Sequence, residues 1–154
     1  NFNSPGQVVI AGEKKAVAHA CELMKEAGAK RALVLPVSVP SHCSLMKDAA
    51  MDFKQTVETV NFQMGSETVL HNVDADYSSN IEEIKSKLVE QLYKPVLWTP
   101  IVQKMKNSGV EKLIEAGPGK VLAGLTRRID KSLTCSAIID VTTLKSTIEE
   151  ISNA

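Results

Sequence analysis

The feature that most constrains the fold is an alternation of short β-branched runs with longer helical patterns along the 154 residues. The runs typical of strands cover residues 8–11, 31–35, 68–73, 112–116 and 135–139. A helical pattern follows each run, as parallel strands require, because their connections must cross the sheet. The alternation therefore predicts an α/β fold with a parallel sheet covered by helices on both faces.

Six stretches carry apolar residues at helical spacing, namely 13–27, 45–60, 80–92, 99–108, 120–129 and 143–152. Asn80 is a typical N-cap, and Glu83 follows three residues later, as in a capping box. We expect Glu83 to pair with Lys87 one turn further along the helix. Thr99 and Pro100 predict a capped helix start with proline at the first helical position.

The composition excludes several classes of protein. Eighteen basic and eighteen acidic residues cancel, so the chain lacks the electrostatic footprint of a nucleic-acid binder. No apolar run approaches the length that spans a bilayer. The three cysteines Cys21, Cys43 and Cys135 form an odd number without zinc-type spacing. We therefore expect a protein of a reducing cytoplasm rather than a disulfide framework.

The most suggestive single residue is His42, at the end of the run 31–39 and beside the turn formers Pro40 and Ser41. Histidine titrates nearest neutral pH, so an imidazole at the mouth of a strand is suited to proton transfer. The alternative from residue chemistry alone is an ordinary polar loop residue. Neighbouring motifs are needed to choose between the two interpretations.

A glycine turn at 117–120 lies between a predicted strand and a predicted helix, as phosphate-binding loops do. A P-loop would need glycine at 114 and Ser or Thr at 121, where Ile114 and Val121 stand. A dinucleotide fingerprint would need a third glycine where Leu122 stands, although Asp140 follows the next strand at a suitable distance. A tight turn is the better interpretation, and a Rossmann-like nucleotide-binding domain remains an alternative.

Metal and thiol chemistry find little support. His19, Cys21 and His71 offer no second pair of ligands for zinc. Cys43 adjoins His42, but neighbouring side chains on an extended strand point to opposite faces, so the two would form a poor nucleophile–base pair. We expect no metal and no cofactor.

Four segments together resemble one protein family in order and spacing. They are NFNSPGQVVIAG at 1–12, PVSVPSHCSLM at 36–46, QLYKPVLW at 91–98 and EAGPGKVL at 115–122. The chain resembles the C-terminal half of the bacterial malonyl-CoA:acyl carrier protein transacylases, which act in fatty acid synthesis. The resemblance implies that residues 1–41 are part of a small ferredoxin-like subdomain. It also implies that residues 42–154 are the C-terminal part of an α/β-hydrolase-like acyltransferase subdomain.

The resemblance also implies roles for individual residues. His42 matches the general base that activates a serine nucleophile, and the main-chain carbonyl of Gln91 matches the acceptor that holds its imidazole. Asn3 and Ser41 match positions near the substrate. The expected substrate is malonyl-CoA, a coenzyme A thioester, and the expected protein partner is an acyl carrier protein.

The nucleophile itself is not found in the sequence. A serine in this chemistry sits on a Gly-x-Ser-x-Gly elbow, and no such motif occurs between Asn1 and Ala154. We therefore expect a fragment whose partner is the missing N-terminal half of the enzyme, and which is inactive alone. A non-catalytic α/β module that binds a carrier protein or coenzyme A is an alternative.

Overall fold

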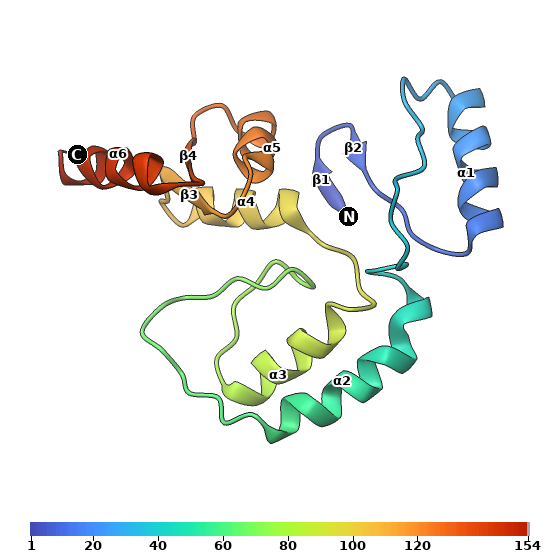
Figure 1. Cartoon of the computed structure of the whole chain (residues 1–154), viewed down its shortest axis with the longest axis horizontal. Helices are drawn as coiled ribbons and strands as arrows, with labels where there is room; N and C mark the ends of the chain where they lie inside the picture. Colours follow the sequence, from blue (N-terminus) through green and yellow to red (C-terminus); the bar gives the residue numbers. More distant parts are fainter. Residues whose placement is uncertain (154) are drawn as a thin grey trace. The chain divides into compact units, whose positions relative to one another are not determined.

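The computed structural model describes residues 1–153 and divides them into two compact units (Figure 1). Unit 1 holds Asn1 and Val8–Leu97, and unit 2 holds Phe2–Gln7 and the described residues from Trp98 onward. The main boundary between the two units thus falls between residues 97 and 98. The subdomain boundary expected from the sequence lies between residues 41 and 42. The α/β class is confirmed, because six α-helices accompany a small parallel sheet within residues 1–153.

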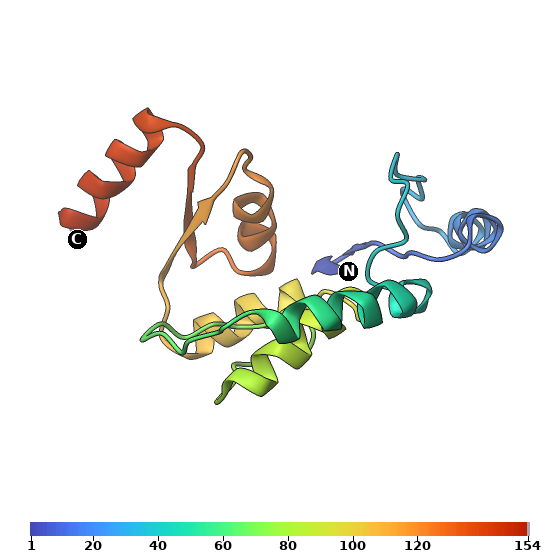
Figure 2. The same ribbon diagram turned by 60° about the horizontal axis from the view of Figure 1, so that its bottom comes forward.

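Unit 1 is built mainly from helices, which are α1 (Lys14–Glu26), the 3₁₀ turn η1 (Ser44–Met46), α2 (Lys47–Thr59) and α3 (Ile81–Glu90). The three helices predicted from apolar spacing in this part of the chain are therefore present. Figures 1 and 2 show α2 and α3 side by side. Their contact buries Ala50, Val57 and Val89, and the partly buried Phe53, Phe62, Leu92 and Tyr93 pack against this core.

The strand predicted at 31–35 is wrong. No β-strand is assigned there, and the side chains of Leu33, Val34 and Leu35 are 63%, 69% and 50% exposed. A β-branched run becomes a strand only when a neighbouring backbone accepts and donates its hydrogen bonds. Within residues 1–153 no strand pairs with this segment, so it stays irregular and unpaired.

Two other predicted strands are much shorter than expected. The run 8–11 contributes only to β2 (Gln7–Val8), which forms a two-stranded sheet with β1 (Phe2–Ser4). The run 68–73 contributes a single bridge between Leu70 and Tyr77. Propensity alone therefore overestimated the extent of sheet in unit 1.

The start of α3 shows how local sequence produces the helix. The side-chain oxygen of Asn80 accepts the main-chain N–H of Glu83 at 2.9 Å, as an N-cap should. The Glu83 carboxylate reaches back one residue further than a capping box requires, and it accepts the main-chain N–H of Ser79 at 2.9 Å. The expected pairing of Glu83 with Lys87 is replaced by a different arrangement, because Lys87 forms its ion pair with Asp74 at 2.8 Å.

Unit 2 contains the predicted parallel strands. Its elements after β1 are α4 (Trp98–Asn107), β3 (Lys112–Ala116), α5 (Val121–Ile129), β4 (Thr134–Ile138) and α6 (Val141–Ser152). Strands β3 and β4 pair in parallel, with Lys112 opposite Thr134 and Ala116 opposite Ile138. Figure 2 shows this pair of strands between α5 and α6. The expectation that Pro100 is the first residue of its helix is wrong by two positions, since α4 begins at Trp98.

None of the helices within the described residues is both long and apolar enough to cross a membrane.

Candidate functional site

His42 lies in unit 1, in the short turn that joins the irregular segment 31–41 to η1. Its backbone is in the left-handed region, with φ of 64°. A residue other than glycine occupies this region only when its surroundings hold it there, and such positions concentrate at functional sites. The turn before it is tight, because the main-chain N–H of Ser41 donates to the carbonyl of Val39 at 2.8 Å.

Two consecutive carbonyls hold His42 in place. Its ring Nδ1 lies 2.7 Å from the main-chain oxygen of Gln91, and its own main-chain N–H donates to the oxygen of Leu92 at 2.9 Å. A carbonyl oxygen can only accept a hydrogen bond, so Nδ1 must carry the proton in this pair. The Nε2 nitrogen of the neutral ring then keeps its lone pair and is able to accept a proton.

Gln91 is the residue that caps the C-terminus of α3, and its position explains why its oxygen is available. The last carbonyls of a helix have no partners within the helix. They also form the negative end of the helix dipole, which favours a positively charged group nearby. The end of α3 therefore orients the imidazole of His42 through the oxygen of Gln91.

The structure brings three of the four predicted site residues together in unit 1. Ser41 and His42 are consecutive, and Gln91 touches the ring of His42. The fourth, Asn3, lies in β1 and belongs to unit 2, where it is half-buried. Cys43 donates its S–H to the carbonyl of Pro40 at 3.2 Å, a local contact that suits a packing role.

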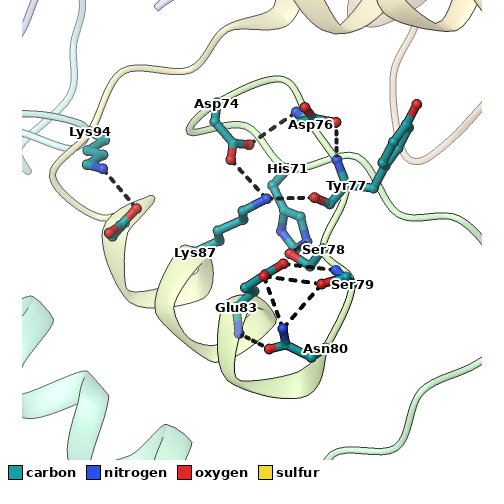
Figure 3. A network of polar contacts seen from close by, with 11 residues as sticks. His71, Asp74, Asp76, Tyr77, Ser78, Ser79, Asn80, Glu83, Lys87 and Lys94 are labelled. Atoms are coloured by element: carbon teal, nitrogen blue, oxygen red, sulfur yellow. Dashed lines mark hydrogen bonds and ion pairs between the residues drawn. The ribbon is translucent and has the colours of Figure 1, made fainter.

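Nothing in the sequence pattern indicated the contact of Leu92 with His42 or the polar network on α3. Figure 3 shows this network, which joins residues 71–79 to the helix. In it, Nε2 of His71 lies 3.1 Å from the hydroxyl of Ser78. Burial lowers the pKa of His71, the nearby Lys87 ammonium lowers it further, and the Asp74 carboxylate opposes both effects. His71 is therefore a buried member of a structural network that favours its neutral form.

The glycine turn at 117–120 does not offer its helix to a phosphate. The carboxylate of Glu115 accepts the main-chain N–H groups of Leu122 and Ala123, at 3.1 Å and 2.8 Å. These are the N–H groups at the start of α5 that an anion would use. Because a carboxylate from β3 already occupies them, the arrangement disfavours the nucleotide-binding alternative.

In serine–histidine acyltransferases and hydrolases, the base imidazole is likewise oriented by a third group. Comparison with known proteins identifies which family this chain resembles. No protein-family model matches the chain. The malonyl CoA-acyl carrier protein transacylase of Haemophilus influenzae is 53% identical over 150 residues, which are 97% of this chain and 48% of the relative.

Solved structures lead to the same family. The acyl carrier protein S-malonyltransferase of Vibrio cholerae matches with a TM-score of 0.92 at 56% identity, over 96% of this chain and 48% of its own. A malonyl-transacylase in complex with its type II PKS acyl-carrier protein matches with a TM-score of 0.95 at 50% identity, over 97% of this chain and 48% of its own. The chain is homologous to the malonyl CoA-acyl carrier protein transacylases, and it spans about half the length of the relatives it matches, their C-terminal part.

Proposed function

We propose that this chain is the histidine-bearing part of a malonyl-CoA:acyl carrier protein transacylase of fatty acid synthesis, and that His42 is its general base. The observation that carries the proposal is the 2.7 Å contact between Nδ1 of His42 and the oxygen of Gln91. This contact directs the proton to Nδ1 and leaves Nε2 free to act as a base. The homology to acyltransferases of this specificity supports the same role.

The chemistry is a double transfer through a serine on the other half of the enzyme. Nε2 of His42 takes the hydroxyl proton as the serine oxygen attacks the malonyl thioester, and the coenzyme A thiol leaves with a proton returned by the imidazolium. In the second step the same nitrogen takes the proton of the carrier protein's pantetheine thiol, which attacks the acyl-serine. The serine hydroxyl is then regenerated with the proton from the imidazolium. No cofactor takes part, because coenzyme A enters as a substrate.

Two substrate contacts complete the proposed site. Ser41 directly precedes the base and would lie next to the acyl group. Asn3 would contact the thioester or the pantetheine arm. The acyl carrier protein is the second substrate, and the complex of a homologous transacylase with its carrier protein supports this partnership.

The proposal includes the fold of the whole enzyme. Residues 1–41 would belong to a small ferredoxin-like subdomain, and residues 42–154 to an α/β-hydrolase-like subdomain, in a cytoplasmic protein. The other half would cover apolar surface that is now exposed, in the segment 33–37 and along α6. The exposed side chains on one face of α6 are Val141, Leu144, Ile148 and Ile151.

The total surface of the chain supports a large missing partner. The chain exposes 10716 Å². Two separate compact domains of its combined mass would expose only about 9,200 Å² by the usual scaling of surface with mass. The excess is of the order that a protein–protein interface buries on one side.

A chimera tests the proposal directly. This chain replaces the matching half of the Haemophilus influenzae transacylase, so that the relative supplies the serine. We expect the chimera to transfer malonyl from coenzyme A to an acyl carrier protein, and the chain alone to transfer none. Sustained turnover by the chain alone would overturn the proposal. A folded but inactive chimera, together with tight binding of a carrier protein by the chain, would favour a non-catalytic binding module instead.

A further inference from the structure

Lys87 is the centre of the polar network that joins residues 71–79 to α3 (Figure 3). Its ammonium nitrogen lies 2.8 Å from Oδ2 of Asp74 and donates to the main-chain oxygen of Tyr77 at 2.9 Å. The side chain is only 13% exposed. A lysine this far from water is favourable only with such partners, and their removal leaves unmatched polar groups behind.

The same loop also binds the chain beyond α3. The main-chain oxygen of Asn72 accepts the N–H of Leu97 at 2.9 Å. Segment 91–97 therefore runs between two attachments to the loop, with Lys87 before it and Leu97 at its end. The two carbonyls that hold His42 belong to Gln91 and Leu92, within this segment.

Lys87 and Gln91 are directly connected along the helix. The main-chain N–H of Gln91 donates to the main-chain oxygen of Lys87 at 3.0 Å. The last turn is secured further by Lys94, whose ammonium donates to the Glu90 carboxylate at 2.9 Å. A small rotation or shift of this turn would move the Gln91 oxygen away from the imidazole. A hydrogen bond weakens steeply when its length and angle depart from ideal geometry.

We propose that Lys87 is a positioning residue for the imidazole of His42. It holds α3 against the loop through Asp74 and Tyr77, and so keeps the oxygen of Gln91 within hydrogen-bond distance of Nδ1. Its importance for catalysis rests on the proposed function. Its effect on the ring can be measured without any reaction.

Lys85 provides a matched control on the same helix. Its side chain is 15% exposed, and its ammonium lies 3.3 Å from Glu58 and 3.7 Å from Glu82. It therefore resembles Lys87 in burial and in its acidic partners, but its contact with Glu58 joins α3 to α2 rather than to the loop. Lys85→Met removes the same charge and keeps a similar side-chain volume.

The experiment is proton–nitrogen NMR of the chain labelled with ¹⁵N at histidine, which gives signals from only three residues, His19, His42 and His71. In Lys87→Met, we expect exchange of the His42 Nδ1–H with water to accelerate about tenfold, which is what losing roughly one hydrogen bond implies. Lys87→Arg should restore much of the protection. Asp74→Asn, which removes the other half of the ion pair, should act in the same direction as Lys87→Met.

The His71 signals show in each sample that the network has changed, because Lys87 lowers the pKa of His71 in the wild type. If Lys87→Met raises the pKa of His71 but leaves the exchange of the His42 proton unaltered, the proposal is wrong. It is also wrong if Lys85→Met accelerates this exchange equally, since the effect would then be general destabilisation. An inactive chimera with a normal response of the His42 signal would contradict the proposed function and leave the positioning role standing.

Discussion

Nδ1 of His42 and the main-chain oxygen of Gln91 lie 2.7 Å apart, although 49 positions separate the two residues in the sequence. The acceptor is a carbonyl at the end of a helix rather than a carboxylate. Orientation of the ring therefore depends on where the backbone of α3 ends and much less on the identity of the side chain at 91. This relationship gives the catalytic proposal its most specific tests.

The first prediction concerns His42 itself. In the chimera, His42→Ala should slow acylation by malonyl-CoA by about a hundredfold or more, the usual contribution of a positioned base. The measurement is single-turnover acylation of the serine. His42→Asn is the matched control, because asparagine adopts the left-handed backbone of this position more readily than alanine does. Asn should be more stable than Ala and equally slow. An acylation rate like that of the wild type in either variant would show that another group takes the proton.

The second prediction separates the main chain of Gln91 from its side chain. Gln91→Met and Gln91→Glu keep a good helix former at the end of α3, so the carbonyl stays in place. Acylation should fall far less than in His42→Ala. Gln91→Pro should be much worse, because proline removes the N–H that donates to the oxygen of Lys87 and disturbs the helix end.

Circular dichroism of each Gln91 variant provides the folding control. A Met variant that is folded and yet as slow as His42→Ala would show that the side chain, and not the carbonyl, holds the imidazole.

The third prediction concerns the start of α3. Asn80→Ala removes the acceptor of the Glu83 N–H and should lower the free energy of unfolding by about 1 kcal/mol, the typical value of an N-cap. Urea denaturation measures this change, and Asn80→Ser, which restores a capping oxygen, should recover most of it. Equal losses in Ala and Ser would contradict the capping role.

The fourth prediction is a pH dependence that comes from His71. Its pKa in the folded protein is lowered, mainly by burial and then by Lys87, whereas the ordinary value is 6.5. Between the lowered pKa and 6.5 the unfolded chain binds more protons than the folded one, so the free energy of unfolding must fall as the pH falls through this range. Above pH 6.5 the full contribution is present.

Urea denaturation at pH 7.5 and pH 5.5 tests this dependence (both pH values chosen as roughly one unit either side of the ordinary value). His71→Gln should show a smaller decrease between them than the wild type does. The control is His19→Gln, which removes an imidazole whose side chain is 70% exposed and should leave the decrease as it is. A decrease of the same size in His71→Gln would assign it to other groups.

The fifth prediction concerns the unpaired segment 31–39. The double variant Leu33→Asp and Val34→Asp changes two side chains that are exposed in the isolated chain. Its effect on the free energy of unfolding of the isolated chain should therefore be small, about 0.5 kcal/mol per site or less. In the chimera, where we expect the other half to cover this segment, the same changes should prevent folding or lower the melting temperature markedly. Equal effects in the two contexts would show that the segment stays exposed in the whole enzyme.

Several features followed from the sequence because short-range physics decides them. The helix cap at Asn80 depends on residues within one turn, and the strand–helix–strand unit from Lys112 to Ile138 supplies its own partner strand. The amphipathic patterns of the helices are also local. Residue chemistry alone left His42 open between a base and a polar loop residue. The family resemblance predicted that His42 is the base and that the main-chain carbonyl of Gln91 holds its imidazole, and both roles stay predictions.

Other features required the tertiary structure. The run 31–35 has the composition of a strand, but pairing needs a second backbone that no local pattern supplies. The partner of Lys87 proved to be Asp74, 13 positions away, and not the nearer Glu83, because Glu83 is engaged at the helix cap. The sequence by itself thus determined the elements whose hydrogen bonds and contacts join residues close together along the chain. The contact of His42 with Gln91 joins two residues 49 positions apart, so it depends on tertiary packing. The packing of α2 on α3 helps to offset the entropy of closing such a loop.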